Sequence, residues 1–138
     1  MRAFKFVVLA LPLVLAAAGC DSVLDDIPTT PDPVTVTETF TGSFNINGAV
    51  THTFFSTATG AVTATLTSLG ENPPAAVGLS LGTYAGSSCS LTITNDKAVV
   101  TSVVTGIVTT LGGSLCVRIY DVGSLTASVP YEIRVDHK

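Results

Sequence analysis

Tryptophan is absent from this sequence of 138 residues, which has only three tyrosines, two histidines and six basic residues. The lack of tryptophan weakens the case for the stacked aromatic platform that many sugar-binding surfaces use. Two histidines provide neither a histidine-rich metal site nor a paired-histidine base without help from distant acids. The basic residues are also scattered along the chain rather than clustered, so no phosphate-binding surface for nucleic acid is predicted.

The longest apolar run lies near the N-terminus and has the form of an export signal. Arg2 and Lys5 precede the thirteen apolar residues Phe6–Ala18, which are too few to span a bilayer core of ~30 Å as a stable anchor. The segment Leu15–Cys20 (LAAAGC) resembles a bacterial lipobox, in which cleavage occurs before the cysteine and lipid is attached to it. We therefore expect acylation of Cys20 and attachment to a membrane through lipid. The alternative is an ordinary secretory signal in which Cys20 is incidental.

Residues 20–33 are acidic and contain three prolines, a composition that favours an extended, disordered tether. The predicted organisation is therefore a lipoprotein signal peptide at 1–19, the tether at 20–33 and one domain at 34–138. After cleavage, four basic residues remain against ten acidic ones. Export and lipidation predict a location in the bacterial cell envelope, with the protein anchored by lipid to a membrane and facing the periplasm or the exterior. The choice between inner and outer membrane stays open.

The body of the sequence alternates apolar and polar residues every second position, and no helical apolar period persists. This pattern predicts an all-β fold, a single antiparallel, jelly-roll-like β-sandwich of about eight or nine short strands. Asn47-Gly48 predicts a type I′ hairpin between its flanking strands, and Asn95–Lys97 predicts a second turn. We expect the strands at 34–40, 41–46, 49–56, 61–68, 75–81, 89–94, 98–105, 114–121 and 131–136.

Two cysteines remain once Cys20 is assigned to lipid. Cys89 and Cys116 both fall in expected strands, and an exported protein meets an oxidising environment, so we expect a disulfide between them. Closing 27 residues of chain would stabilise the fold by roughly 3 to 4 kcal/mol in the chain-entropy model. Two buried free thiols are the alternative, and a zinc pair would need two further ligands from distant residues.

The domain resembles the bacterial pre-peptidase C-terminal domain and related small hypothetical lipoproteins. The resemblance consists of strand patterns and glycine turns spread over most of 39–136. In that family the module is a β-sandwich and is usually accessory, with roles in secretion, substrate attachment or protein contacts. The resemblance therefore implies no catalytic role. The matching segments are Phe40–Phe44, His52–Phe55, Gly60–Leu66, Gly113–Gly123 and Tyr131–Val135.

One string matches a catalytic motif. Gly78–Gly82 reads G-L-S-L-G, as in the nucleophile elbow of α/β-hydrolases, and Asp121 and His137 follow in the order of that triad. The motif requires a strand that leads into a helix, whereas we expect a loop to follow Gly82. We expect His52 to be a partly buried strand residue and His137 to be solvated near the terminus, so neither is a convincing base. No catalytic residue and no enzymatic activity are predicted.

Aspartates at expected strand ends and turns are the remaining metal candidates. Asp96, Asp121 and Asp136 lie where some β-sandwiches hold Ca²⁺, but no local run of carboxylates supplies the six to eight oxygens that Ca²⁺ takes. Ordinary turn capping explains their positions as well, so we predict no metal and no cofactor.

Two loops are the expected contact surfaces, at Glu71–Pro74 and Gly82–Ser88, and Tyr84 in the second is the aromatic residue expected to be exposed. We therefore predict a non-enzymatic, lipid-anchored envelope protein that acts as a protein-interaction or accessory module. The alternative is a glycan-binding module at the cell surface. The expected partners are the membrane, through lipid, and a protein of the envelope, with a glycan as the alternative and no nucleic acid.

Overall fold

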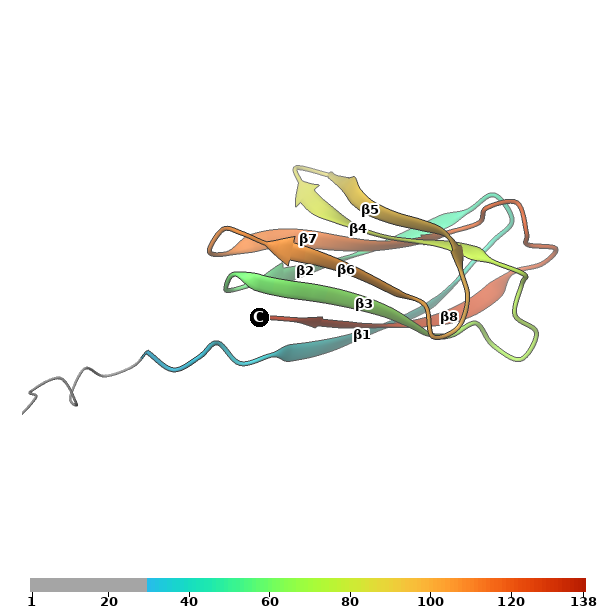
Figure 1. The fold of residues 1–138 in the computed structure, drawn as a ribbon. Coiled ribbons are helices and arrows are strands. Elements are labelled where there is room, and N and C mark those ends of the chain that lie inside the picture. The colour runs from blue at the N-terminus through green and yellow to red at the C-terminus, as the bar shows by residue number, and fades with distance from the viewer. Residues whose placement is uncertain (1–29) are drawn as a thin grey trace, which may run out of the picture. The chain divides into compact units, whose positions relative to one another are not determined.

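Eight β-strands and no helix make up residues 30–138, the part of the chain that the computed structural model describes (Figure 1). The predicted signal peptide, Cys20 and most of the predicted tether lie outside these residues. No helix in the described part is long and apolar enough to cross a membrane. The strands are β1 (Val36–Phe44), β2 (Ala49–Ser56), β3 (Gly60–Ser68), β4 (Val77–Ala85), β5 (Ser88–Ala98), β6 (Val103–Val108), β7 (Gly113–Tyr120) and β8 (Val129–His137).

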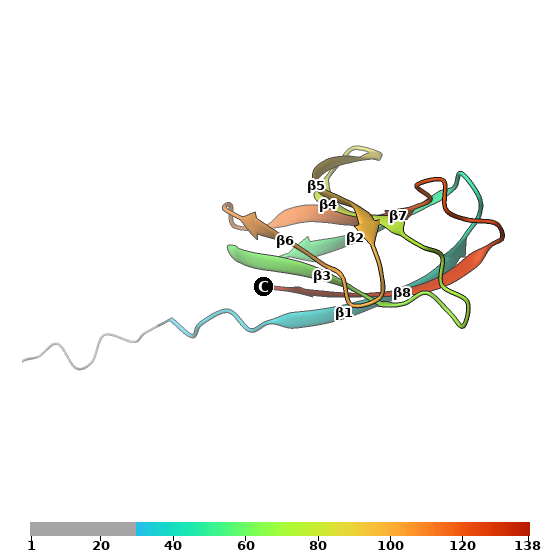
Figure 2. The ribbon, with the colours of Figure 1, turned by 45° about the vertical axis from the view of Figure 1, so that its right-hand side comes forward.

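The strands form two four-stranded antiparallel sheets that pack face to face (Figures 1 and 2). One sheet has the order β1-β8-β3-β6 and is called the first sheet below; the second has the order β2-β7-β4-β5. The chain crosses from one sheet to the other at every connection except β4 to β5. This is the strand order of a jelly roll. The predicted all-β, jelly-roll-like sandwich is therefore confirmed.

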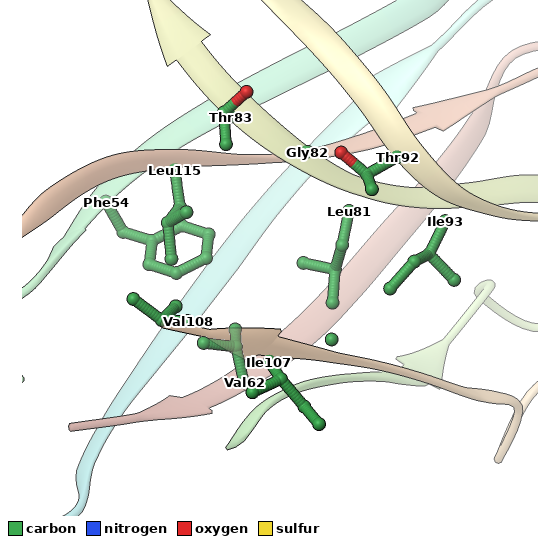
Figure 3. A pocket seen from close by; sticks show the side chains of 11 residues that line it. Phe54, Val62, Leu81, Gly82, Thr83, Thr92, Ile93, Ile107, Val108 and Leu115 are labelled. Atoms are coloured by element: carbon green, nitrogen blue, oxygen red, sulfur yellow. The ribbon is translucent and has the colours of Figure 1, made fainter. Parts of the chain in front are cut away.

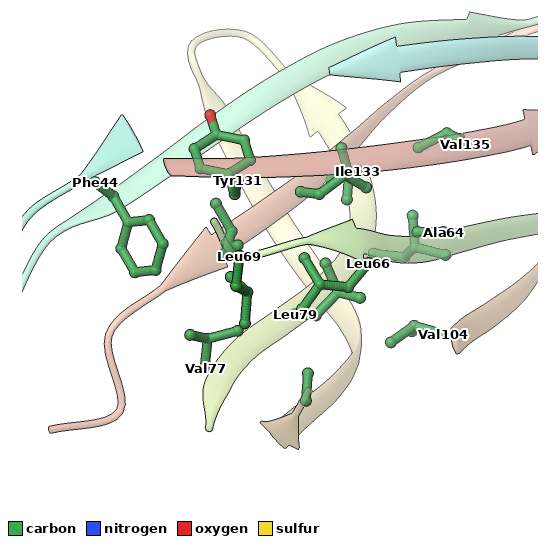
Figure 4. Close-up of a cluster of buried hydrophobic side chains, with 14 of the residues drawn as sticks. Phe44, Ala64, Leu66, Leu69, Val77, Leu79, Val104, Tyr131, Ile133 and Val135 are labelled. Carbon is green, nitrogen blue, oxygen red and sulfur yellow. The ribbon is translucent and has the colours of Figure 1, made fainter. Parts of the chain in front are cut away.

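The core lies between the sheets and follows from the alternation of each strand (Figure 4). In β8, for example, Tyr131, Ile133 and Val135 are buried whereas Pro130 and Arg134 are exposed. Burying a leucine, isoleucine or valine side chain contributes about 2 kcal/mol, so this stripe fixes which face of each strand turns inward. The large side chains with almost no exposure include Leu66, Leu69, Leu79, Ile119, Ile133, Val77, Val117 and Val135.

The prediction of a hairpin at Asn47-Gly48 is wrong, because the strands on either side of this turn do not pair with each other. The backbone does turn sharply there, since the Gly48 amide donates to the Asn45 carbonyl over 2.8 Å and Asn47 has a φ of 56°. The turn leads from the first sheet into the second, so β1 pairs with β8 and β2 pairs with β7. The two strands expected at 34–40 and 41–46 are accordingly one continuous strand, β1, which pairs with β8 over its whole length.

The predicted turn at Asn95–Lys97 is also wrong. Asn95–Lys97 lies inside β5, where the pairing with β4 shifts between Val77 and Leu79, so these residues form a bulge rather than a chain reversal. The Asn95 side chain accepts a 3.0 Å hydrogen bond from the Lys97 amide and caps this bulge. The reversal comes later, at residues 99–102, and the strand expected at 98–105 is β6, which begins only at Val103.

Candidate functional site

A polar hollow of about 430 Å³ lies on the outer face of the second sheet. Its side chains come from alternate, outward-facing positions: Thr51 and Thr53 from β2, Arg118 from β7 and Tyr84 from β4. Ser87, Ser88 and Cys89 complete the lining from the tip of the β4–β5 hairpin. The hollow is therefore open to solvent and lined mainly by hydroxyl groups, with one cation and one aromatic ring.

The segment expected to be a loop at Gly82–Ser88 is instead the tip of this hairpin. β4 continues to Ala85 and β5 begins at Ser88, so only Gly86 and Ser87 form the turn. Tyr84 is a half-buried strand residue rather than the exposed loop residue that was expected. The composition of glycine, serine and threonine in this segment is typical of a loop, but in the sheet these small residues permit a close approach between strands.

The hairpin tip curls over the outer face because β4 carries a glycine at its bend. The pairing of β4 with β5 shifts between Leu81 and Gly82, and a Cβ added to Gly82 would lie 2.1 Å from the carbonyl oxygen of Ser90. Only glycine allows the backbone of β5 to lie this close to β4. The curl gives the hollow its overhanging wall.

Cys89 and Cys116 hold this curl in place. Cys116 pairs with Gly82 on one side of β4, and Cys89 pairs with Tyr84 on the other side. Their Cα atoms are 6.0 Å apart and their sulfur atoms 2.01 Å apart, so the pair is positioned to form the expected disulfide across β4. Such a bond fastens the hairpin tip to the neighbouring strand β7.

Arg118 is the cation of the hollow. Its guanidinium lies 5.8 Å from the ring centroid of Tyr120, a cation–π contact, and its buried Nε has no hydrogen-bond partner. Tyr120 packs over Gly78, where a Cβ would meet its ring, and its hydroxyl donates to Asp96. Burial and this hydrogen bond raise the pKa of Tyr120. In the sequence, Arg118 is one of several scattered cations. Its alternation with Cys116 and Tyr120 is the signal that places all three on one face.

A second hollow, of about 580 Å³, lies between two loops at one end of the sandwich. Residues 69–74 form one wall and residues 124–130 the other. The expected loop at Glu71–Pro74 is therefore present, with Pro73 exposed and Leu69 buried beneath it. Because it sits at the end of the fold, this hollow is framed by backbone and loop side chains instead of by strand faces.

Asp121 organises the loop that forms the second wall. One of its carboxylate oxygens accepts hydrogen bonds from the amides of Gly123, Ser124 and Leu125, and the other accepts one from Asn47 over 2.9 Å. The bond from the Asn47 amide is the main reason why the pKa of Asp121 lies below its usual range, and the other three act in the same direction. Asp121 therefore caps a turn, which was the alternative to a Ca²⁺ site that the sequence suggested for this residue.

An apolar gap of about 130 Å³ opens between the two sheets at the β5 and β6 edges (Figure 3). Leu81 and Ile93 reach into it from the second sheet, and Val62 and Val108 approach it from the first (Figure 3). No acid, base or cysteine lines this gap. Its only polar side chains are those of Thr83 and Thr92, and no base lines the gap to activate either hydroxyl.

The catalytic string at Gly78–Gly82 lies in the middle of β4, an interior strand. Ser80 has no exposed surface and its hydroxyl donates to the Thr94 hydroxyl over 3.2 Å. β4 leads into a hairpin and not into a helix, so the nucleophile elbow is excluded here, although the expected loop after Gly82 is a strand.

His52 is partly buried, as expected. Its Nε2 and the Tyr131 hydroxyl are 2.6 Å apart, and its ring stacks on Phe40 at a centroid distance of 4.8 Å. Burial lowers the pKa of His52, so the neutral ring is favoured inside the fold. This histidine contributes to packing between β2, β1 and β8.

The expectation that His137 is solvated is wrong. β8 continues to this residue, so its side chain points inward in alternation with Val135 and is only 3% exposed. The ring lies against Phe54, and its Nε2 is 2.9 Å from a carboxylate oxygen of Glu38. Proximity to the terminus suggested exposure, but the pairing of β8 with β1 determines the burial.

The three aspartates considered for Ca²⁺ have separate partners. Asp96 accepts from Tyr120, and Asp136 accepts from Thr37 and Arg134. These bonds to Thr37 and Arg134 lower the pKa of Asp136. Within residues 30–138, no three His, Cys, Asp or Glu side chains are close enough together to hold one metal ion.

Comparison with known proteins adds no family. No protein-family model matches the sequence, and no curated protein matches it either. The resemblance to the pre-peptidase C-terminal domain stays a prediction that rests on the segments named above.

Proposed function

We propose that this protein is a non-enzymatic, lipid-anchored accessory protein of the bacterial cell envelope, and that its β-sandwich binds a partner protein through the two loops at 69–74 and 124–130. The observation that supports this most is where the loops lie. β1 starts at Val36 beside the last residues of β8, whereas the loops follow the opposite ends of the strands (Figure 1). A nine-residue strand separates the two ends by about 30 Å.

This arrangement suits a tethered binding module. The chain that leads back to Cys20 enters the sandwich at Val36, and the two loops lie at the opposite end of the strands. Loops held by a rigid scaffold commonly carry binding residues. Here the Asp121 carboxylate accepts hydrogen bonds from four backbone amides and so fixes one of the loops. Binding of a partner would therefore cost little conformational entropy in this loop.

The absence of an enzymatic role in this proposal rests on the candidate groups themselves. Ser80 is fully buried and hydrogen-bonded, and His52 and His137 are both engaged inside the sandwich. None of them combines exposure with a base or nucleophile in reach. Activity on a panel of ester, peptide and glycoside substrates that disappears in His52→Ala would overturn this part of the proposal.

Site-specific crosslinking in the native envelope tests the protein contact. A photo-crosslinking residue at Asn72, exposed in the loop at 69–74, is compared with one at Thr59, which is exposed at the opposite end. We expect one stoichiometric protein adduct from position 72 only, and its loss when purified full-length protein is added as competitor. Equal adducts from both positions, or none from position 72, would overturn the proposed surface.

The lipid anchor is tested separately, by intact-mass analysis of the protein extracted from membranes. We expect a chain that begins at Cys20 and carries the mass of acyl groups. An unmodified Cys20, or a chain cut at another position, would contradict the lipoprotein assignment while leaving the binding surface to be judged on its own test.

A glycan-binding role is the second candidate, because the polar hollow on the second sheet favours it. Hydroxyl groups of Thr51, Thr53, Ser87 and Ser88 surround one aromatic ring, that of Tyr84. Hydroxyls donate and accept hydrogen bonds, as sugar hydroxyls do. Retention of the full-length protein on immobilised polysaccharides tests this role, and failure to bind any member of a broad panel would exclude it.

A further inference from the structure

The polar hollow on the second sheet carries a charge that the described residues do not balance. Arg118 lines it, and no carboxylate lies within ion-pair distance of its guanidinium. The other described arginine, Arg134, is paired with Asp136 at 3.0 Å on the first sheet. Tyr120, against which the guanidinium lies, donates its hydroxyl to Asp96, so this carboxylate already has a partner.

The Arg118 guanidinium has no partner of opposite charge among the described residues. Its Nε is screened from solvent and makes no hydrogen bond with the protein, so a ligand in the open hollow would meet the terminal nitrogens of the guanidinium instead. Its guanidinium is held against Tyr120, so its position is set before any ligand arrives. A planar guanidinium matches a carboxylate with two parallel hydrogen bonds, which makes a carboxylate the natural complement.

The other residues that line the hollow restrict the chemical class of the ligand further. Four of its seven residues are serine or threonine, and Tyr84 provides an aromatic surface at the side. A ligand that matches these groups has several hydroxyls, one face able to pack on a tyrosine ring and one negative charge. The volume of about 430 Å³ falls within the ~300–1,000 Å³ typical of small-ligand sites.

We infer that this hollow binds a sugar residue that carries a carboxylate, a hexuronate, with the carboxylate on Arg118, the ring against Tyr84 and the sugar hydroxyls on Thr51, Thr53, Ser87 and Ser88. The inference deepens the second candidate function, glycan binding, and rests on it. The site is built in advance: the hairpin tip that forms its overhanging wall is held by Gly82 and by the cysteine pair across β4. Binding therefore requires the oxidised protein.

Isothermal titration of the full-length protein in detergent tests the inference with two polymers of one backbone. Oligogalacturonate carries free carboxylates, and its methyl ester lacks the charge but keeps the hydroxyls. We expect binding to the acid, at least tenfold weaker binding to the ester, and an affinity for the acid that falls as salt is raised. Binding to both with equal affinity would leave glycan binding standing and overturn the acidic specificity. Binding to neither would overturn the inferred site, and glycan binding as such would then be decided by the polysaccharide panel.

Two substitutions assign the contact to Arg118. Arg118→Gln should weaken binding of the acid by about 10- to 100-fold, the range for hydrogen bonds to a charged group, and Arg118→Lys should restore only part of it because an ammonium lacks the planar fork. Arg134→Gln removes an arginine from the other sheet and should leave binding unchanged. Circular dichroism of each variant confirms the fold. Equal loss in Arg134→Gln, or no loss in either Arg118 variant, overturns the assignment.

A final arm separates a sugar acid from a peptide acid. Short peptides with a free C-terminal carboxylate are titrated beside the same peptides with an amidated end. If the peptide acid binds as tightly as oligogalacturonate and depends equally on Arg118, the inferred sugar specificity is wrong. Weak binding of both peptides, together with loss of oligogalacturonate binding on reduction of the cysteine pair, supports the site as described.

Discussion

Removing the link between Cys89 and Cys116 should cost this domain a large part of its stability. The link closes 27 residues of chain. The chain-entropy relation then gives about 3.5 kcal/mol at 25 °C, from an entropy loss of roughly 12 cal/mol/K in the unfolded state. The total free energy of unfolding of a domain of this size is about 5 to 15 kcal/mol. A loss of this size should therefore lower the melting temperature by about 15 °C or more.

Urea denaturation followed by far-ultraviolet circular dichroism is the appropriate assay, because the chain has no tryptophan to report on unfolding. Wild-type protein is compared with and without reductant, and with a Cys89→Ala/Cys116→Ala variant. Reduction keeps the side-chain volume, whereas the variant also removes a sulfur from the fully buried Cys116. We expect both to lose about 3 to 4 kcal/mol, with the variant losing the same amount or slightly more.

A small effect of reduction on stability would refute this reasoning. If reduction lowers the free energy of unfolding by less than about 1 kcal/mol, either the bond is not formed or the unfolded chain is already restrained in that region. Mass analysis after alkylation of free thiols separates these two explanations. A loss limited to hydrogen-exchange protection in 82–91, with no change in global stability, would show that the link holds only the hairpin tip.

Three further perturbations test other parts of the fold. Gly82→Ala should destabilise the protein by about 1 to 3 kcal/mol in urea, since its Cβ would lie 2.1 Å from the Ser90 carbonyl, whereas Gly113→Ala, with open space at that position, should cost far less; equal midpoints would contradict the close approach. The lowered pKa of His52 means that the unfolded state binds the proton more readily, so the melting temperature should begin to fall as the pH drops below about 6.5, and His52→Gln should flatten the curve between pH 7 and 5; an unchanged slope would refute this. Asp121→Asn should lower the urea midpoint at pH 7, with the difference from wild type shrinking as the pH falls below the ordinary value of 3.8, because the depressed pKa stabilises the fold only while the carboxylate is charged; a difference that does not depend on pH would exclude the charge as the cause.

The fold class was predictable because burial on one face of each strand leaves a period of two in the sequence. β2 begins at Ala49 and ends at Ser56 as expected, and β8 shows the expected inward Tyr131, Ile133 and Val135. These strands are bounded by clear turn residues and have strictly alternating cores. Local pattern and tertiary packing agree there, so the local signal was sufficient.

The pairing of strands was not predictable in the same way. Asn47-Gly48 specifies a reversal of the chain, but a reversal is compatible both with a hairpin in one sheet and with a step into the facing sheet. The choice depends on β8, which is more than 80 residues away and competes for the edge of β1. The pairing partner of β1 is thus determined by the whole jelly roll, and the residues of the turn do not indicate it.

The candidate site was only partly accessible from the sequence. Tyr84 and the loop at Glu71–Pro74 were identified by composition, and both line hollows in the structure. Arg118 was missed because its importance lies in what it lacks, a carboxylate partner, and partners across strands depend on the register. His137 was misplaced because a position next to the terminus says nothing about whether the last strand is paired.

The pairing of β1 with β8 also determines how the domain would respond to mechanical load. Tension transmitted through the residues before Val36 pulls along β1, whose nine register pairs tie it to the last strand of the fold. If the opposing grip is on the loops at the far end, all of these pairs are sheared together and must break nearly at once. If the grip is instead near His137, the same pairs peel apart one after another and yield at lower force. A partner held at the loop end would thus be attached through the stronger of the two pulling geometries, and the lifetime of the folded domain under load would depend on where it is held.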